Sequence, residues 1–272
     1  MGKGCRLVLR TFAKLNLCLD ILYKRSDGFH EIDSLFQNIS LYDEMEIVLK
    51  AGDGNVNISS NVNIEDNILY KVWKVIGCKD KDVYIKLEKN IPIGGGLGGG
   101  SSNAAGFIVA LSKAGIISRE EIPEIAQSVG SDVPFFIYGG TAIVRGRGEI
   151  VTPLPSLTNW YDFKVKLYFP DFPISTKEAY SKLKLEWFGK APMSSLELYE
   201  AYKEGNIVKI GKGTYNVFEY IIPKKLFNEI QNLRTKYPAA LTGSGSTYFA
   251  LRNDGEYHFI DKGVEIYAFE EA

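Results

Sequence analysis

The stretch Pro92-Ile93-Gly94-Gly95-Gly96-Leu97-Gly98-Gly99-Gly100-Ser101-Ser102-Asn103-Ala104-Ala105 gives the chain its most distinctive local pattern. Six of the seven residues from Gly94 to Gly100 are glycine, and such a run loses much backbone entropy when it becomes ordered. A run of this kind is typical either of a flexible surface loop or of a loop whose bare backbone lies against a ligand. The flanking segments favour the ligand-binding loop.

Those flanks predict a strand before the glycine run and a helix after it. Residues 83–88 alternate apolar and polar side chains, as in a half-buried strand. After the run, Ser101 or Ser102 is a candidate helix cap, and residues 104–111 carry apolar side chains at helical spacing. A strand, a glycine loop and a helix N-terminus form a phosphate site, because free N–H groups and the positive end of the helix dipole face the anion. The run is not a Walker A loop, since no lysine follows its last glycine.

Length and composition narrow the class of protein. The 272 residues are enough for about two domains, with an ordinary 45% hydrophobic and 24% charged content. A net charge of −1 argues against a nucleic-acid partner, and the chain has no apolar run that could span a bilayer. Three cysteines without C-x-x-C spacing and only two histidines argue against a zinc site or a Ser-His-Asp triad. Without a signal-peptide pattern, we expect a cytoplasmic protein.

Two charged residues have an open role on pattern alone. Every odd-numbered residue from Leu15 to Ile21 is apolar, which predicts a strand with one apolar face and with Lys14 and Asn16 on the other. Lys14 then fits a solvated strand face. Asp132 stands before a valine and a proline and fits a helix N-cap. The pattern by itself favours these structural roles over catalytic ones.

The rest of the first half predicts an alternation of short strands and helices. The expected elements are strands at 45–49 and 56–59 around a turn at 52–54, a helix capped by Asp66 and ending at Gly77, a helix opened by a capping box at 118–121 and ending at Gly130, and a hairpin of 141–144 with 149–152. The hairpin turn carries Arg145 and Arg147, which fit either a solvated turn or a phosphate contact.

A proline-containing segment at 153–157 predicts the boundary between two domains, 1–155 and 156–272. The elements expected beyond it are strands at 165–169, 239–241, 247–251 and 264–269, helices at 176–188, 194–203 and 223–236, and a second glycine loop at 242–246. Strands and helices follow no regular βαβ order, so the predicted class is α+β.

Three separated motifs together resemble those of the GHMP kinases. Residues 13–17 (A-K-L-N-L) resemble the first motif of that group, 92–105 the second and 241–247 the third. Within the group, the chain is similar to the family of 4-diphosphocytidyl-2-C-methyl-D-erythritol kinases. That closer similarity rests on A-K-L-N-L, on D-G-F-H at 27–30, on the full glycine run, on S-D-V-P-F-F at 131–136, on E-D-N at 65–67 and on N-V-F-E at 216–219.

The resemblance covers the whole chain and implies a fold and an activity. It implies the two-domain GHMP kinase fold, with an N-terminal domain like domain 2 of ribosomal protein S5, a ferredoxin-like C-terminal domain, and the site between them. It implies ATP-dependent phosphorylation of the 2-hydroxyl of 4-diphosphocytidyl-2-C-methyl-D-erythritol, in non-mevalonate isoprenoid biosynthesis. Asp132 is then the base and Lys14 its cationic partner, which reverses the structural roles above.

The resemblance also implies binding residues for both substrates. For the cytidyl substrate these are Asn16, Phe29, His30, Thr176, Tyr180, Gly243 and Ser244, with the cytosine held between the rings of Phe29 and Tyr180. For ATP they are Asn67, Ile68, Pro92, Gly94, Gly95, Gly96, Leu97, Gly98, Gly99, Gly100, Ser101, Ser102 and Asn103. Mg²⁺ is the implied metal; Ser101 or Ser102 is a candidate contact, and no carboxylate ligand is identified.

Some alternatives stay open at this point. Another small-molecule GHMP kinase, or a non-catalytic nucleotide-binding sensor of the same fold, would share the glycine motifs. The D-G-F-H motif argues against the first, and retention of both Lys14 and Asp132 argues against the second. A monomer or weak homodimer is expected, with small molecules as partners. Residues 252–262 depart from the family, which usually has a helix there.

Overall fold

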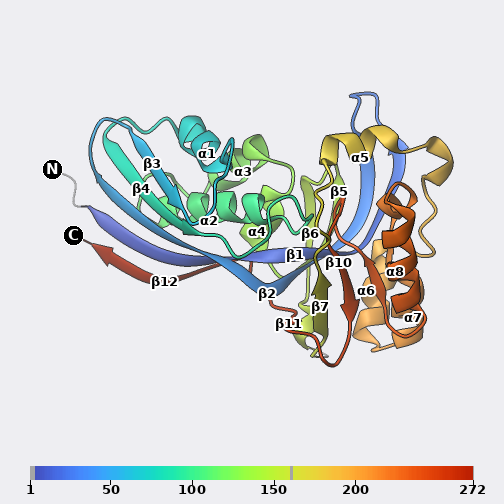
Figure 1. The fold of residues 1–272 in the computed structure, drawn as a ribbon. Coiled ribbons are helices and arrows are strands. Elements are labelled where there is room, and N and C mark those ends of the chain that lie inside the picture. The colour runs from blue at the N-terminus through green and yellow to red at the C-terminus, as the bar shows by residue number, and fades with distance from the viewer. Residues whose placement is uncertain (1–3, 160–161, 272) are drawn as a thin grey trace.

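The fold is built around two very long antiparallel strands that run through both halves of the molecule (Figure 1). The computed structural model describes residues 4–159 and 162–271. Within them, β1 (Cys5–Lys24) and β2 (His30–Ala51) pair along most of their length. The larger sheet has the order β12-β1-β2-β4-β3, with β5 and β6 attached beside β2 and β8 beside β1. These flanking strands are β3 (Val56–Ser60), β4 (Lys81–Glu88), β5 (Thr141–Gly146), β6 (Ile150–Leu154), β8 (Tyr215–Asn216) and β12 (Val264–Glu271).

A smaller sheet and two groups of helices complete the architecture. The smaller sheet has the order β11-β7-β10-β9, formed by β7 (Lys164–Tyr168), β9 (Ala239–Leu241), β10 (Tyr248–Leu251) and β11 (Tyr257–His258). The first helical group is α1 (Ile68–Ile76), α2 (Gly99–Lys113), α3 (Ile122–Val129) and α4 (Val133–Tyr138). The second is α5 (Thr176–Lys182), α6 (Ser195–Lys203), α7 (Ile207–Gly213) and α8 (Lys224–Arg234). Short 3₁₀ turns lie at Leu157–Asn159, Leu185–Trp187 and Val217–Tyr220. The α+β class is confirmed.

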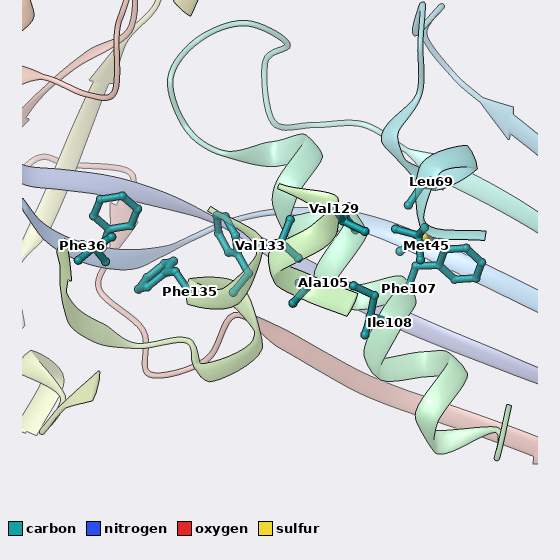
Figure 2. Close-up of a cluster of buried hydrophobic side chains, with 14 of the residues drawn as sticks. Phe36, Met45, Leu69, Ala105, Phe107, Ile108, Val129, Val133 and Phe135 are labelled. Carbon is teal, nitrogen blue, oxygen red and sulfur yellow. The ribbon is translucent and has the colours of Figure 1, made fainter. Parts of the chain in front are cut away.

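The helices α1 to α4 cover one face of the larger sheet and enclose the main core (Figure 2). The side chains labelled there come from β2, α1, α2, α3 and α4: Phe36, Met45, Leu69, Ala105, Phe107, Ile108, Val129, Val133 and Phe135. Phe107 and Ile108 on α2 are fully buried, and burial of such a side chain is worth about 1.5–3 kcal/mol. This packing holds α2 firmly and so positions the glycine run at its N-terminus.

A β-bulge in β1 changes which side of the sheet its side chains face. The pairing register with β2 shifts between Asn16 and Cys18. Leu17 packs in the core shared with α6 and the smaller sheet, whereas Leu19 and Ile21 pack in the helix-covered core. The prediction that the odd-numbered residues share one face is therefore wrong beyond Leu17, because one extra residue in a strand reverses its sides.

Several local predictions are confirmed. The hairpin of β5 and β6 and the last strand, β12, form where expected. Gly77 ends α1 in the left-handed conformation with φ of 65°. The second glycine loop lies between β9 and β10. In the divergent segment 252–262, the described structure has only the two-residue strand β11 and no helix.

Other local predictions need correction. The cap of α1 is Asn67, whose Oδ1 accepts from the Leu69 N–H at 3.1 Å; Asp66 precedes it with φ of 51°. The cap of α2 is Gly98, so Ser101 lies inside the first turn. Strand β3 pairs in parallel with β4 and not with β2, because α1 carries the chain back so that β4 lies between them.

The second half departs from prediction in its helices. The single helix expected over 176–188 is α5 followed by a separate 3₁₀ turn, and α7 was not predicted at all. The capping box at 118–121 forms only in part: the Ser118 N–H binds the Glu121 carboxylate at 2.7 Å, and α3 starts at Ile122.

The domain boundary near residue 155 stays a prediction, and β8 and β12 from beyond it pair with β1. No helix among the described residues is both long and apolar enough to cross a membrane.

Candidate active site

A cavity of about 430 Å³ brings together the two glycine loops, β1 and the residue that precedes α4. We call it the donor cavity. The predicted site residues in its lining are Lys14, Asn16, Asn67, Ile68, Pro92, Gly94, Gly95, Gly96, Leu97, Gly98, Gly99, Gly100, Ser101, Asn103, Asp132, Thr176, Tyr180, Gly243 and Ser244. Residues far apart in the sequence, from 14 to 244, therefore face one space.

A second cavity of about 780 Å³ adjoins the first, and we call it the acceptor cavity. Its lining contains Phe29 and His30, which do not line the donor cavity. The four residues that line both cavities are Asp132, Arg147, Thr176 and Tyr180. The carboxylate predicted to be the base thus lies where the two spaces meet.

The glycine run folds as a loop that needs glycine at alternate positions. Gly94, Gly96 and Gly98 have φ of 73°, 77° and 74°, a region that side chains with a Cβ rarely adopt. The first turn of α2 begins at Gly99 and leaves its N–H groups without helical partners. Those groups and the helix dipole favour an anion in the donor cavity.

The two glycine loops pack backbone against backbone. A Cβ placed on Gly96 would lie 2.2 Å from the Thr242 carbonyl oxygen, and one on Gly243 would lie 2.8 Å from the Gly96 Cα. Gly243 also has a positive φ, of 56°. On the other side, the Asn216 amide donates to the Gly243 carbonyl at 2.9 Å. Only glycine allows this approach, which closes the donor cavity between the two halves of the chain.

Lys14 is a buried cation, not a residue of a solvated strand face. It is 3% exposed, and its Nζ donates to Asn16 Oδ1 at 2.5 Å and to the Gly96 carbonyl at 2.9 Å. Burial lowers the pKa of the Lys14 ammonium from its ordinary 10.5, and attraction to the Asp132 carboxylate opposes this shift. The Nζ also lies 4.8 Å from the centre of the Phe36 ring.

Asp132 precedes α4 as predicted, but within the described residues its side chain makes no capping hydrogen bond to that helix. Gly148 provides room for the carboxylate: a Cβ there would lie 3.2 Å from Asp132 Oδ1. Burial raises the pKa of the Tyr180 phenol, and the negative charge of the Asp132 carboxylate raises it further. Asp132 thus holds the N-cap position without capping the helix through its side chain, and its carboxylate is available to the cavities.

Asn16 is almost completely buried, and the oxygen and nitrogen of its side chain are already bonded to neighbouring residues rather than open to a substrate. It is 1% exposed; its Oδ1 accepts from Lys14 and, at 2.8 Å, from the Gly243 N–H. Its Nδ2 donates to Ser34 Oγ at 3.0 Å. The amide therefore holds the lysine and the second glycine loop together.

The two serines after the glycine run face different ways. Ser101 lines the donor cavity. Ser102 is fully buried, and its hydroxyl donates to the Phe12 carbonyl at 2.7 Å. The structure thus does not bring Ser102 to the cavity with the other predicted ATP-binding residues. Its hydroxyl ties α2 to β1.

Sequence reasoning did not select Lys89 and Asp43, which lie under the glycine run. Lys89 lines the donor cavity and forms a buried ion pair with Asp43, whose other oxygen accepts from the Ile91 N–H at 2.8 Å. Asn103 donates to the same carboxylate at 2.9 Å. The signal in the sequence was a lysine between the predicted strand at 83–88 and the glycine loop. Its aspartate partner on β2 could not be found from local pattern.

The predicted cytosine-binding residues line the acceptor cavity. Phe29 is 51% exposed, and Tyr180 packs its ring against His30, with 5.2 Å between ring centres. Burial, with Lys24 nearby, lowers the pKa of the His30 imidazole from its ordinary 6.5, so this ring is neutral at neutral pH. Thr176 Oγ1 lies 3.0 Å from Ser244 Oγ and links α5 to the second glycine loop.

Comparison with known proteins identifies the family of the chain. Residues 67–140 match the family model described as the GHMP kinases N terminal domain. The chain is 65% identical over 272 residues, all of both chains, to 4-diphosphocytidyl-2-C-methyl-D-erythritol kinase of Fervidobacterium nodosum. It is 49% identical to the enzyme of that name from Thermosipho africanus, over 97% of this chain and 98% of the relative.

A solved structure supports the same relationship. The crystal structure of a 4-(cytidine 5'-diphospho)-2C-methyl-D-erythritol kinase matches with a TM-score of 0.71 and 30% identity, over 92% of this chain and 90% of that one. The chain therefore belongs to the 4-diphosphocytidyl-2-C-methyl-D-erythritol kinase family of the GHMP kinases, and it is a small-molecule kinase.

Proposed function

We propose that this enzyme transfers the γ-phosphoryl group of ATP to the 2-hydroxyl of 4-diphosphocytidyl-2-C-methyl-D-erythritol, with Asp132 as the base and Lys14 as its partner. The observation that carries the proposal is the meeting of the two cavities at Asp132. A donor in one cavity and an acceptor in the other would place their reacting groups beside this carboxylate. The names of the relatives supply the substrate class.

ATP fits the donor cavity by its charge. The N-terminus of α2 favours the phosphates, and Lys14 and Lys89 place two buried cations in the lining. Asn67 and Ile68 at the start of α1 lie in the same lining and are the residues proposed for the adenine end. The Asn67 side chain also caps α1, which fixes its orientation.

The acceptor cavity fits a cytidyl group by its aromatic residues. Phe29 and Tyr180 line it from separate elements, and His30 lies beside Tyr180. A base stacked on an aromatic ring gains about 1–3 kcal/mol. A neutral imidazole can both donate and accept hydrogen bonds, which suits the edge of a cytosine.

The proposed chemistry is proton removal with in-line transfer. Asp132 accepts the proton of the substrate 2-hydroxyl while the oxygen of that hydroxyl forms a bond to the γ-phosphorus. The bond from that phosphorus to the bridging oxygen breaks, and ADP leaves with the electron pair. Lys14 attracts the ionised form of Asp132 and stabilises negative charge on the reacting oxygens. The hydrogen bonds of Lys14 to Asn16 and Gly96 hold it in position.

Mg²⁺ fits this site as an ion held largely by the ATP phosphates. Among the residues that the structure describes, no group of three or more His, Cys, Asp or Glu side chains could hold a metal ion. Ser101 provides a hydroxyl oxygen in the lining, and Mg²⁺ usually keeps several waters and binds substrate phosphates beside a small number of protein oxygens. When bound, it neutralises charge on the phosphates.

The experiment combines an acceptor panel with Asp132→Asn. ADP release is followed with the cytidyl substrate, mevalonate and homoserine, and ATP binding is measured by calorimetry. We expect turnover of the cytidyl substrate alone, and a kcat of Asp132→Asn lower by on the order of 10²- to 10⁴-fold with ATP binding retained. Asp53→Asn, at an exposed turn position outside both cavities, is the matched control.

Three outcomes would contradict the proposal in different ways. Turnover of mevalonate or homoserine without the cytidyl substrate would indicate another alcohol kinase. ATP binding without turnover of any acceptor would indicate a sensor. An unchanged rate in Asp132→Asn would remove this carboxylate from the mechanism while leaving the substrate assignment intact.

A further inference from the structure

Arg147 lies in the turn between β5 and β6, at the border of the donor and acceptor cavities. It lines both of them, and it is the one arginine in either lining among the described residues. Its Cζ lies 4.7 Å from the centre of the Phe29 ring, so the guanidinium covers one face of that ring. A cation therefore occupies a surface of the ring on which a base would stack.

The ion pairing of Arg147 is loose. Its Nε is 3.8 Å from Glu149 Oε1, beyond hydrogen-bond distance, and its side chain is 40% exposed. Arg145, two residues earlier, differs: its Nε donates to Asp33 Oδ1 at 3.1 Å, and it lines neither cavity. The sequence left both arginines as solvated or phosphate-binding. The structure separates them into a paired arginine and one that is free to change partner.

We infer that Arg147 binds the diphosphate of the acceptor and leaves the face of Phe29 when the cytosine stacks there; this rests on the proposed function. A cation over an exposed ring is held weakly, and a stacked base competes with it for the same face. The displaced guanidinium stays beside the acceptor cavity, where the diphosphate supplies the anion. Arginine suits this role because its planar fork binds phosphate oxygens in pairs.

The border between the two cavities, where Arg147 lies, would gather negative charge when both substrates are bound. Donor phosphates on one side and an acceptor diphosphate on the other would bring several negative charges next to the Asp132 carboxylate. Like charges in one site oppose each other. Lys14 and Lys89 line only the donor cavity, and Lys24 and Lys177 line only the acceptor cavity, whereas Arg147 lines both. Arg147 is therefore a binding residue that selects acceptors carrying a diphosphate.

The test compares CDP with cytidine, which share the base and differ in the diphosphate. Binding of each to the wild type, Arg147→Gln and Arg147→Lys is measured by calorimetry. For Arg147→Gln we expect the Kd of CDP to rise on the order of 10- to 100-fold, as for loss of a charge-assisted hydrogen bond. The Kd of cytidine should stay the same or fall, because the Phe29 face is uncovered. Arg147→Lys should lie between the wild type and Arg147→Gln for CDP.

Arg145→Gln is the matched control, because it removes the same charge from the same hairpin outside both cavities. It should leave both Kd values within about twofold of wild type. Steady-state kinetics add a second readout: Arg147→Gln should raise KM for the cytidyl substrate far more than KM for ATP.

The contradicting results are distinct. An equal loss of CDP and cytidine affinity in Arg147→Gln would show a packing role only and overturn the inference. An equal rise in both KM values would assign Arg147 to the donor and overturn it as well. If the wild type binds neither CDP nor cytidine, the cytidyl assignment of the acceptor cavity fails, and the inference fails with it. If the wild type binds both and Arg147→Gln keeps the same preference for CDP, the inference alone fails.

Discussion

Lys14 donates from Nζ to Oδ1 of Asn16 at 2.5 Å, and this amide oxygen also accepts from the Gly243 N–H at 2.8 Å. A single side chain on β1 thus joins the buried cation to the second glycine loop. The Asn16 N–H adds a contact to Thr242 Oγ1 at 3.1 Å. Because β1 belongs to the larger sheet and the loop connects strands of the smaller one, Asn16 sets the relative position of the two sides of the donor cavity.

Replacement of Asn16 by alanine should therefore act on turnover more than on stability. Lys14 loses an acceptor and the Gly243 loop loses an anchor, and misplacement of this kind costs on the order of 10²-fold in kcat. Steady-state kinetics check the rate, with Asn57→Ala at an exposed position on β3 as the control. A kcat for Asn16→Ala within about twofold of wild type would contradict the positioning role.

Replacement of Lys14 by methionine should abolish activity and make the fold more stable at neutral pH. Burial lowers the pKa of Lys14 in the folded chain below the ordinary 10.5 that it keeps in the unfolded chain. At pH values between the folded and the unfolded pKa, the unfolded chain therefore binds more protons than the folded chain. The stability of the wild type contributed by this residue then rises with pH up to about 10.5. The advantage of Lys14→Met in thermal unfolding should shrink over the same range. A variant less stable than wild type at neutral pH, with no such trend, would contradict the assignment.

Replacement of Gly96 by alanine should separate the two glycine loops. The new Cβ would lie 2.2 Å from the Thr242 carbonyl oxygen, at a φ of 77° that costs about 1–3 kcal/mol for a residue other than glycine. Urea unfolding should show this loss together with loss of ATP binding. Gly211→Ala is the control: no atom lies within 4 Å of its Cβ position in α7, and it should gain about 0.5–1 kcal/mol. Equal stability of the two variants would contradict the backbone contact.

The adjacent serines of α2 should give different phenotypes. Ser101→Ala should raise KM for ATP several-fold with little change in unfolding, because its side chain faces the donor cavity. Ser102→Ala leaves the Phe12 carbonyl without its 2.7 Å partner and should lower the free energy of unfolding by about 1 kcal/mol. Kinetics and denaturant unfolding of both variants check the pair. If the two phenotypes were exchanged, the orientation of the helix start would be wrong.

Local pattern was sufficient for features that depend on neighbours in the chain. The positive φ of Gly94, Gly96 and Gly98 requires glycine whatever surrounds it, so a phosphate loop before a helix could be predicted directly. The hairpin of β5 and β6 follows in the same way from alternation around a glycine-containing turn. The substrate class came from the combined motifs and their resemblance to a family, since no single motif carries it.

The role of Lys14 shows where local pattern failed. Alternation predicted a solvated face, but the glycine run lies against that face and makes it buried. The contact joins Lys14 to a residue 82 positions away, which no short window of sequence contains. Local pattern also failed for Asp132. An aspartate directly before a helix usually caps that helix with its side chain, but in this fold the Asp132 carboxylate makes no capping hydrogen bond and lines the cavities.

By itself, the sequence determined the α+β class, many of the short elements, the glycine loops and the kinase family, because each of these depends on backbone propensities and motifs within short segments. Tertiary structure alone decided that Ser102 faces the core, that Asp43 pairs with Lys89, and that Arg147 but not Arg145 reaches the cavities. Those contacts join residues whose separation in space is set by the packing of α2 and the long strands. Their energies depend on burial and on charge, which arise only when the chain has folded.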